Sequence, residues 1–131
     1  NFSAARRLTQ VLLPGMQAQA WGRVINFSGS MEPRSVNAAT AAKAALHLWS
    51  KGLSSEVAGQ GITVNAIAPG PTATALFLEG KSDELIARLI QAAPLERLGT
   101  VEDIAAVLDF AVNEGSNWVN AQILRVNGGV V

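Results

Sequence analysis

The sequence predicts an α/β fold built around a parallel β-sheet. Helical and strand patterns alternate along its 131 residues in the order α-β-α-β-α-α-β. The central strand candidate, residues 62–68, is almost continuously apolar and is expected to be buried. Strands that are separated by helices pair in parallel through helical crossovers, and a chain of this length suits one domain or part of one.

The first two predicted elements are a helix over residues 2–20 and a strand over residues 23–27. Apolar residues of the helix recur at spacings of three and four, which places them on one face. These residues are Phe2, Ala5, Leu8, Leu12 and Met16. Pro14-Gly15 weakens the last turns of the helix, and Ser28-Gly29-Ser30 bounds the strand.

The next two are a helix over residues 38–58 and the strand over residues 62–68. Asn37 is a suitable N-cap, and the start of this helix is rich in alanine, which favours helix and permits close approach of another backbone. Gly59 and Gly61 supply the stop. The strand ends at Pro69-Gly70-Pro71, which forces a turn.

Two helices and a strand complete the order. Ser82-Asp83-Glu84 opens a helix that runs to about Ala92 and is stopped by Pro94. Thr100 and Asp103 resemble a capping box that opens a helix to about Val112. Residues 122–126 form the last strand.

Composition excludes several classes of function. Net charge is zero, so no basic field exists for nucleic acid or an anionic membrane. The chain has no cysteine and one histidine, which excludes disulfides, thiolate chemistry and a histidine metal cluster. No stretch of about 18 apolar residues and no secretory signal occurs, so a cytoplasmic location without a membrane span is expected. There is no tyrosine.

The balance of apolar and charged residues is unusual for a small free-standing domain. Charged residues make up 15% and apolar residues 49% of the chain. Because a domain of this size buries only about two-thirds of its unfolded surface, apolar surface should remain uncovered. We therefore expect oligomerisation or a missing companion segment, and the first residue, Asn1, is compatible with a truncated chain.

Five motifs follow one another in a recognisable order. They are residues 22–28 (GRVINFS), 41–46 (AAKAAL), 61–71 (GITVNAIAPGP), 94–99 (PLERLG) and 126–129 (VNGG). Together they resemble the C-terminal half of the classical short-chain dehydrogenase/reductase family. The resemblance implies half of a Rossmann-type doubly wound parallel sheet, three strands with flanking helices, with residues 1–131 as a single partial domain. It also implies NAD or NADP as cofactor, although the glycine-rich phosphate turn of the family's N-terminal half has no counterpart here.

The family's catalytic set of Asn, Ser, Tyr and Lys carries over only in part. Lys43 stands in the lysine position and Asn1 in the asparagine position, but Ala39 stands where the tyrosine belongs. The serine position falls on Gly29, and a shift of one residue brings in Ser28 or Ser30. Since the tyrosine is the proton donor for carbonyl reduction, its absence predicts that the chain lacks ordinary dehydrogenase turnover.

The cofactor contacts of the family carry over better. The turn at Pro69 and Gly70 is intact, and Thr72 and Thr74 match positions that contact the nicotinamide carboxamide and the pyrophosphate. Residues 75–93 resemble the substrate-lid region, whose apolar start is consistent with a small or apolar carbonyl or alcohol substrate.

Simpler roles remain open for these residues. Lys43 reads equally as a solvated helix lysine, and His47 as a surface or interface residue. Ser28 and Ser30 are compatible with turn residues, and Thr72 and Thr74 with caps. The alternative function is a dimerising pseudoenzyme or partner subunit, a homo-oligomer through the helices at residues 2–20 and 37–59, and a truncated product without function is a third possibility.

Overall fold

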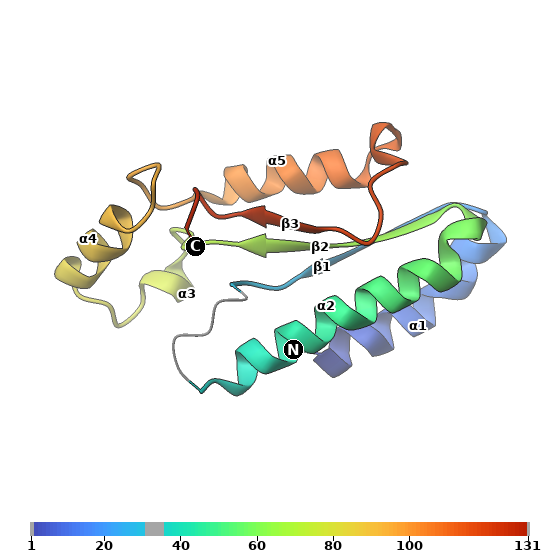
Figure 1. Cartoon of the computed structure of the whole chain (residues 1–131), viewed down its shortest axis with the longest axis horizontal. Helices are drawn as coiled ribbons and strands as arrows, with labels where there is room; N and C mark the ends of the chain where they lie inside the picture. Colours follow the sequence, from blue (N-terminus) through green and yellow to red (C-terminus); the bar gives the residue numbers. More distant parts are fainter. Residues whose placement is uncertain (1, 31–35, 131) are drawn as a thin grey trace.

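The computed structural model describes residues 2–30 and 36–130. Its sheet has three parallel strands in the order β1-β2-β3, which confirms the predicted α/β class. The strands are β1 (Gly22–Phe27), β2 (Ile62–Pro69) and β3 (Ile123–Val126). Their carboxyl ends lie at the same edge of the sheet, beside the segment that carries the short helices α3 (Ala75–Leu78) and α4 (Asp83–Gln91) (Figure 1).

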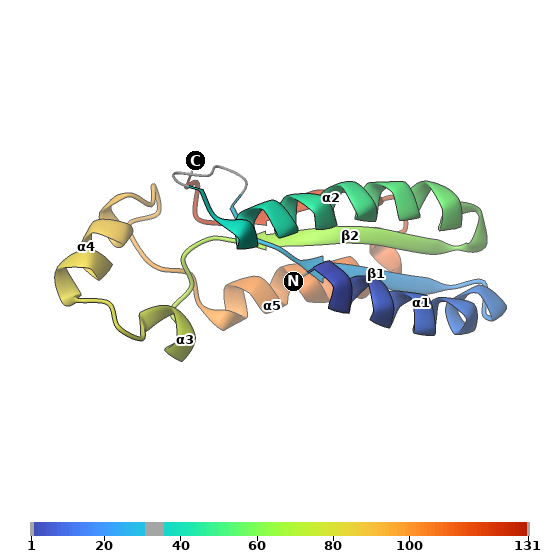
Figure 2. The ribbon, with the colours of Figure 1, turned by 90° about the horizontal axis from the view of Figure 1, so that it is seen from below.

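Three longer helices cover the two faces of the sheet. Helices α1 (Phe2–Ala18) and α2 (Ala38–Val57) lie side by side on one face, and α5 (Val101–Val112) covers the other (Figures 1 and 2). Every residue of β2 from Ile62 to Ala68 is buried, because β2 is the central strand and has helices on both faces. This burial explains its nearly continuous apolar sequence.

The main core lies between the sheet and the α1/α2 layer. Val24, Val57, Ile62 and Val64 form a buried cluster, and Leu13, Met16 and Leu53 pack against it. These apolar side chains come from β1 and β2 and from α1 and α2, so this core depends on the packing of the two helices against the two strands.

The predicted face and end of α1 need correction. The helix ends at Ala18, not at residue 20, and it continues through Pro14. Leu8 and Leu12 are 62% and 49% exposed, whereas Thr9 is buried. The periodicity identified the helix correctly and its face in part. Phe2, Ala5 and Met16 of the predicted face are half-buried, and Met16 packs against the core. Leu8 and Leu12 do not, and Leu13 is the leucine that meets the core.

The predicted caps are confirmed. The Asn37 side chain accepts a hydrogen bond from the backbone N–H of Ala39 at 2.8 Å, which caps α2. At the start of α5, Thr100 Oγ1 accepts from the backbone N–H of Asp103, and Asp103 accepts from that of Thr100. The prediction missed α3, a single turn capped by Thr74, because four residues show no periodicity.

One edge of the sheet has no strand beside it within the described residues. β1 pairs with β2 alone, so its other edge faces no described strand. Phe27 at the end of β1 is half exposed. Within the described part of the chain, no helix is long and apolar enough to cross a membrane.

Candidate active site

A cavity of about 640 Å³ opens at the carboxyl ends of β1 and β2. Ligands of open α/β sheets bind at this edge. The described residues that line it are Ser28, Gly29, Ser30, Lys43, Pro69, Gly70, Pro71, Thr72, Thr74, Leu76, Phe77, Val101 and Ile104. The structure thus brings together every site residue predicted from the sequence except Asn1, which lies outside the described residues.

Lys43 projects from the second turn of α2 over the end of β1. A Cβ atom placed on Gly29 would lie 3.1 Å from Lys43 Nζ, so the ammonium occupies the space beside the glycine. The side chain is half-buried and makes no hydrogen bond or ion pair with any described residue. Glycine at position 29 therefore lets an unpaired cation lie at the carboxyl end of the strand.

Ala39 precedes Lys43 by one helical turn and is exposed. Its methyl group carries no transferable proton, and the sequence contains no tyrosine to replace it. The described lining of the cavity therefore has hydroxyl and ammonium groups as its only ionisable or exchangeable side chains.

Ser28 and His47 form a buried pair behind the cavity. His47 Nε2 lies 2.5 Å from Ser28 Oγ, and the imidazole is only 3% exposed. The expectation that His47 lies on the helix surface or at an interface is therefore wrong for this chain. The position is one of a buried stripe along α2, which comprises Leu46, His47, Ser50, Ser54 and Val57.

The hydrogen-bond pattern assigns the proton of this pair. Ser28 Oγ lies 3.2 Å from the carbonyl oxygen of Ile67 and can donate to it, and His47 Nδ1 has no partner. If Nε2 carries the proton and donates to Ser28, only a lone pair at Nδ1 is unsatisfied. The other tautomer would bury an unpaired N–H, which costs more. The Ser28 hydroxyl is thus directed at Ile67 and away from the cavity.

The surroundings of His47 keep its imidazole neutral. Burial lowers the pKa of His47, and the positive charges of Lys51 and Arg125 lower it further. A neutral imidazole that already donates its proton is a poor acid, because losing that proton would leave an imidazolate. The pair therefore joins α2 to the end of β1, and neither of its protons is directed into the cavity.

The two threonines after the β2 turn have different hydrogen bonds. Thr72 Oγ1 donates to the carbonyl oxygen of Gly70 at 2.9 Å, which tightens the turn. Thr74 Oγ1 accepts from the backbone N–H of Phe77 at 3.2 Å, as a cap of α3. The alternative role of a cap is thus confirmed for Thr74. Its own hydroxyl proton has no acceptor among the described residues and can be donated to a ligand.

Glycine is required at position 70 by close packing. A Cβ atom there would lie 2.6 Å from the Cα atom of Asn127 and would clash with its backbone. This contact joins the turn after β2 to the Asn127-Gly128-Gly129 segment after β3. Two of the sequence motifs therefore meet directly below the cavity.

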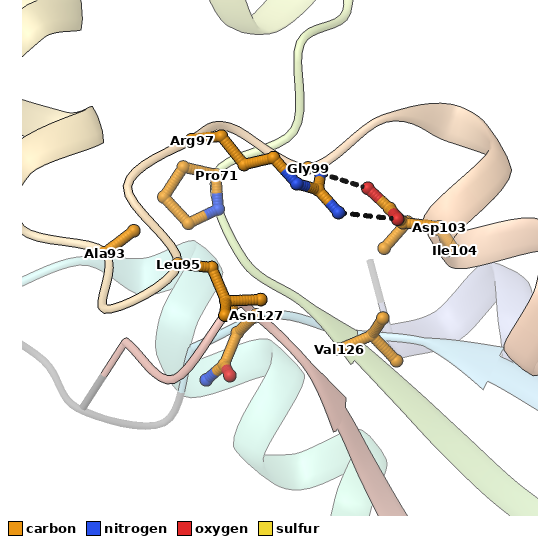
Figure 3. A pocket seen from close by; sticks show the side chains of 10 residues that line it. Pro71, Ala93, Leu95, Arg97, Gly99, Asp103, Ile104, Val126 and Asn127 are labelled. Carbon is orange, nitrogen blue, oxygen red and sulfur yellow. Dashed lines mark hydrogen bonds and ion pairs between the residues drawn. The ribbon is translucent and has the colours of Figure 1, made fainter.

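Two backbone hydrogen bonds hold the two ends of the segment from Ala73 to Leu98 together. Ala73 N–H donates to Gly99 O at 2.8 Å and Gly99 N–H donates to Pro71 O at 2.9 Å. Beside this stem lies a second cavity of about 150 Å³ (Figure 3). At this cavity the guanidinium of Arg97 forms a bidentate ion pair with the carboxylate of Asp103. Nη1 donates to Oδ2 at 2.5 Å, and Nη2 donates to Oδ1 at 2.9 Å.

This ion pair was not anticipated from the sequence. Hydrogen bonding from Arg97 is the largest cause that holds the pKa of Asp103 well below its usual range, with the backbone N–H of Thr100 next. The two opposite charges lie six residues apart in the sequence. A turn separates them, so this spacing does not predict that their side chains meet.

The sequence is similar to those of known proteins. A family model described as Enoyl-(Acyl carrier protein) reductase matches residues 1–131. A short-chain type dehydrogenase/reductase of Picea abies is 43% identical over 113 residues, covering 84% of this chain and 42% of the relative. An NADPH-dependent aldehyde reductase-like protein of Arabidopsis thaliana, described as chloroplastic, is 40% identical over 84% of this chain and 42% of its own length.

Solved structures agree in fold. A 7α-hydroxysteroid dehydrogenase complexed with NADH and 7-oxo glycochenodeoxycholic acid superposes with a TM-score of 0.94 at 28% identity, covering 100% of this chain and 52% of that one. A 3-oxoacyl-acyl-carrier-protein reductase from Brucella melitensis gives a TM-score of 0.92 at 29% identity, over 99% of this chain and 50% of that chain.

A parallel α/β sheet with its cavity at the strand carboxyl ends defines the Rossmann-type class. Within that class, the chain belongs to the short-chain dehydrogenase/reductase family. It spans about half the length of the relatives it matches.

Proposed function

We propose that this chain is the substrate- and nicotinamide-side half of an NAD(P)-dependent oxidoreductase that acts on carbonyl or alcohol groups. The observation that carries the proposal is the cavity at the strand carboxyl ends, with the unpaired Lys43 in the family's lysine position. Relatives support it, since one is an NADPH-dependent aldehyde reductase-like protein and a structural neighbour holds NADH.

The residues present fit the nicotinamide side of a dinucleotide. Lys43 would hold the nicotinamide ribose, and Thr72 and Thr74 with the backbone of Pro69 and Gly70 would hold the carboxamide and the pyrophosphate. A bound dinucleotide would supply the hydride. The ammonium of Lys43, which has no partner among the described residues, and the hydroxyl proton of Thr74 are donors of the kind that these oxygens need.

The need for a proton donor is the reason to expect that the chain by itself does not reduce carbonyl substrates. Reduction of a carbonyl produces an alkoxide-like oxygen, which needs a positioned acid. Ala39 cannot provide one, and the Ser28 hydroxyl is directed to the Ile67 carbonyl. The roles of Ser28 or Ser30 as the family's serine, and of Asn1 as its asparagine, are predictions that rest on the resemblance.

The direct test is to measure NADH and NADPH oxidation by the purified chain with a panel of aldehydes and ketones. We expect no rate above that without protein. Robust turnover would contradict the proposal and require another acid, with Ser30 the first to be replaced by alanine.

A chimera tests the missing tyrosine. The chain would be joined to the N-terminal half of the Picea abies relative, and Ala39→Tyr would be compared with the control Ala38→Tyr, which adds the same side chain to a different face of α2. We expect Ala39→Tyr to raise the reductase rate by about 10²- to 10⁴-fold, because a general acid contributes this much. No gain over the control would indicate that the short segment between β1 and α2 has displaced the site.

A second candidate function is that of a dimerising partner subunit. Leu8, Val11 and Leu12 of α1 and Leu48 of α2 are all exposed, and the two helices lie side by side on one face of the sheet (Figure 2). Exposed apolar side chains on two neighbouring helices favour a protein interface. Through this surface the chain would pair with itself or with a longer family member.

Light scattering after size-exclusion chromatography tests this candidate. We expect a dimer that dissociates in the double variant Leu8→Glu/Leu12→Glu and persists in the control Leu76→Glu, which places the charge on the exposed Leu76 of α3. A monomer at high concentration would exclude homodimerisation through α1 and α2.

A further inference from the structure

A further cavity lies at the amino ends of β1 and β2. Its volume is about 540 Å³, and it is framed by the turn before β1, the turn before β2 and the loop before β3. These connections meet at the end of the molecule opposite α3 and α4 (Figure 1). The described residues next to the undescribed ones lie at the start of α1 and beyond the carboxyl ends of β1 and β3. This cavity therefore shares no lining residue with the candidate active site and does not adjoin the undescribed residues.

The two turns that frame the cavity pack against each other. Gly61 has a φ of 72°, and a Cβ atom there would clash with the carbonyl oxygen of Ala20. The Cζ atom of Arg23 lies 5.0 Å from the centroid of the Trp21 ring, and its Nη1 atom donates to the carbonyl oxygen of Gly22 at 2.9 Å. Stacking and hydrogen bonding thus hold the guanidinium in one place and leave its Nε/Nη2 edge for other contacts.

Two polar atoms of this cavity are buried without a hydrogen-bond partner. They are Nε of Arg23 and Oγ1 of Thr63. The two residues are paired across β1 and β2, so their side chains lie on the same face of the sheet, where strands are about 4.8 Å apart. Nε carries an N–H and Oγ1 an O–H, and an unpaired buried donor is costly. One ligand with two acceptor oxygens can satisfy both.

The charge of Arg23 has no carboxylate partner among the described residues. No residue that lines the cavity is acidic. Nη2 of Arg23 donates to Oδ1 of Asn117, a neutral amide on an exposed residue. An ionised carboxylate is a stronger acceptor than an amide, and it binds a guanidinium edge through two parallel N–H groups. A carboxylate can therefore displace the amide of Asn117 and accept from Nη2 and Nε together.

Two indole rings supply the apolar part of the cavity. Trp118 is 99% exposed and Trp21 is 44% exposed, and both line it. Aromatic rings attract one another in stacked and edge-to-face arrangements, so these indoles favour a ligand with a flat ring. Arg23 is the one cation of the lining, which matches a carboxylate better than a phosphate of about two charges.

We propose that this cavity is a binding site for an aromatic carboxylate. The carboxylate accepts from Nη2 and Nε of Arg23 and from the hydroxyl of Thr63, and the aromatic ring lies against Trp118. The site is separate from the cavity assigned to the dinucleotide, and the inference does not rest on the proposed oxidoreductase function.

Titration of the isotope-labelled chain with benzoate tests the site, because each of the three tryptophans gives its own indole N–H signal in NMR spectra. We expect saturable shifts for Trp21 and Trp118 and none for Trp49, which contacts Phe2 of α1. Benzamide, which has the ring without the charge, should bind about 10-fold more weakly or worse. Cyclohexanecarboxylate, which has the charge without the aromatic ring, should also bind more weakly.

Asn117→Asp and Asn113→Asp form a matched pair. Asn117→Asp places a carboxylate of the chain itself on the Arg23 guanidinium, so it should keep the fold and weaken benzoate by about 10-fold or more. Asn113→Asp adds the same charge outside the cavity lining and should bind benzoate as the parent does. In Trp118→Leu, benzoate should lose its advantage over cyclohexanecarboxylate, and the fold should persist because this side chain is fully exposed.

Four outcomes would overturn the inference. These are the absence of saturable shifts for Trp21 and Trp118 up to the solubility limit of benzoate, equal shifts for Trp49, equal affinities for benzoate and benzamide, and an unchanged benzoate affinity in Asn117→Asp. Tighter binding of inorganic phosphate than of benzoate would likewise overturn it in favour of a phosphate site.

Discussion

The two halves of α2 differ in how they meet the rest of the molecule. The C-terminal half buries the stripe from Leu46 to Val57 against the sheet. The N-terminal half leaves Ala39 exposed, and Lys43 lies at the cavity without a hydrogen-bond or ion-pair partner among the described residues. Packing thus constrains the second half of α2 and leaves the first half open to change of sequence.

The largest effect should come from breaking the packed half. Leu46 is 2% exposed and Leu48, two residues on, is 73% exposed. Leu46→Ala should lower the free energy of unfolding by about 2–5 kcal/mol, since it leaves a cavity in a packed core. Leu48→Ala should change it by about 0.5 kcal/mol or less. Urea unfolding measures both, and equal losses would contradict the contrast between the two positions.

The buried polar pair should rank second. Ser28→Ala removes the acceptor of the His47 Nε2 proton and leaves a buried donor unpaired. We expect a loss of about 1–3 kcal/mol in the free energy of unfolding. Ser55→Ala on the exposed side of α2 is the control and should cost less than half as much. A neutral Ser28→Ala would show that the pair does not stabilise the fold.

Removal of the N-cap of α2 should have the third largest effect on stability. Asn37→Ala removes the acceptor for the N–H groups of Ala39 and Thr40. The expected loss is about 1 kcal/mol, and Asn37→Asp should retain most of the stability because its side chain also caps. Thermal unfolding followed by circular dichroism compares them, and equal effects of alanine and aspartate would exclude the cap as the cause.

The smallest effect should be a pH dependence from His47. Its pKa in the fold is lowered from 6.5, so the unfolded chain takes up a proton first as the pH falls. Stability contributed by the neutral imidazole is present above 6.5 and is lost as the pH falls from there to the folded pKa. His47→Gln should flatten this part of the stability curve. The carboxylates act at lower pH, because the pKa values of Asp103 and Glu84 are also lowered.

Most of the fold could be predicted from the sequence. The order of elements, the buried β2 and the caps at Asn37 and Thr100 follow from local patterns whose physical basis lies within a few residues. The buried face of α1 could be predicted only in part. The helical period correctly includes Met16, but it selects Leu12 although Leu13 is the leucine that packs against the core. Only contact with the sheet and α2 decides between such neighbouring residues.

The candidate site shows the same limit. Motif order placed Lys43, Gly70, Thr72 and Thr74 at one cavity, and the structure brings them together. The spacing of Lys43 and His47 gave their separation along α2 but not the direction of either side chain. His47 turns to Ser28 inside the molecule, whereas Lys43 projects over Gly29.

By itself, the sequence determined the succession of the longer helices and strands and the family. The tertiary structure alone decided that His47 is buried and neutral, that Arg97 pairs with Asp103, and that the Lys43 ammonium takes the space above Gly29. The physical reason is that local patterns depend on neighbours along the chain. The rotation of a helix on its sheet, and hence the surroundings of each side chain, is fixed only when all the layers pack together.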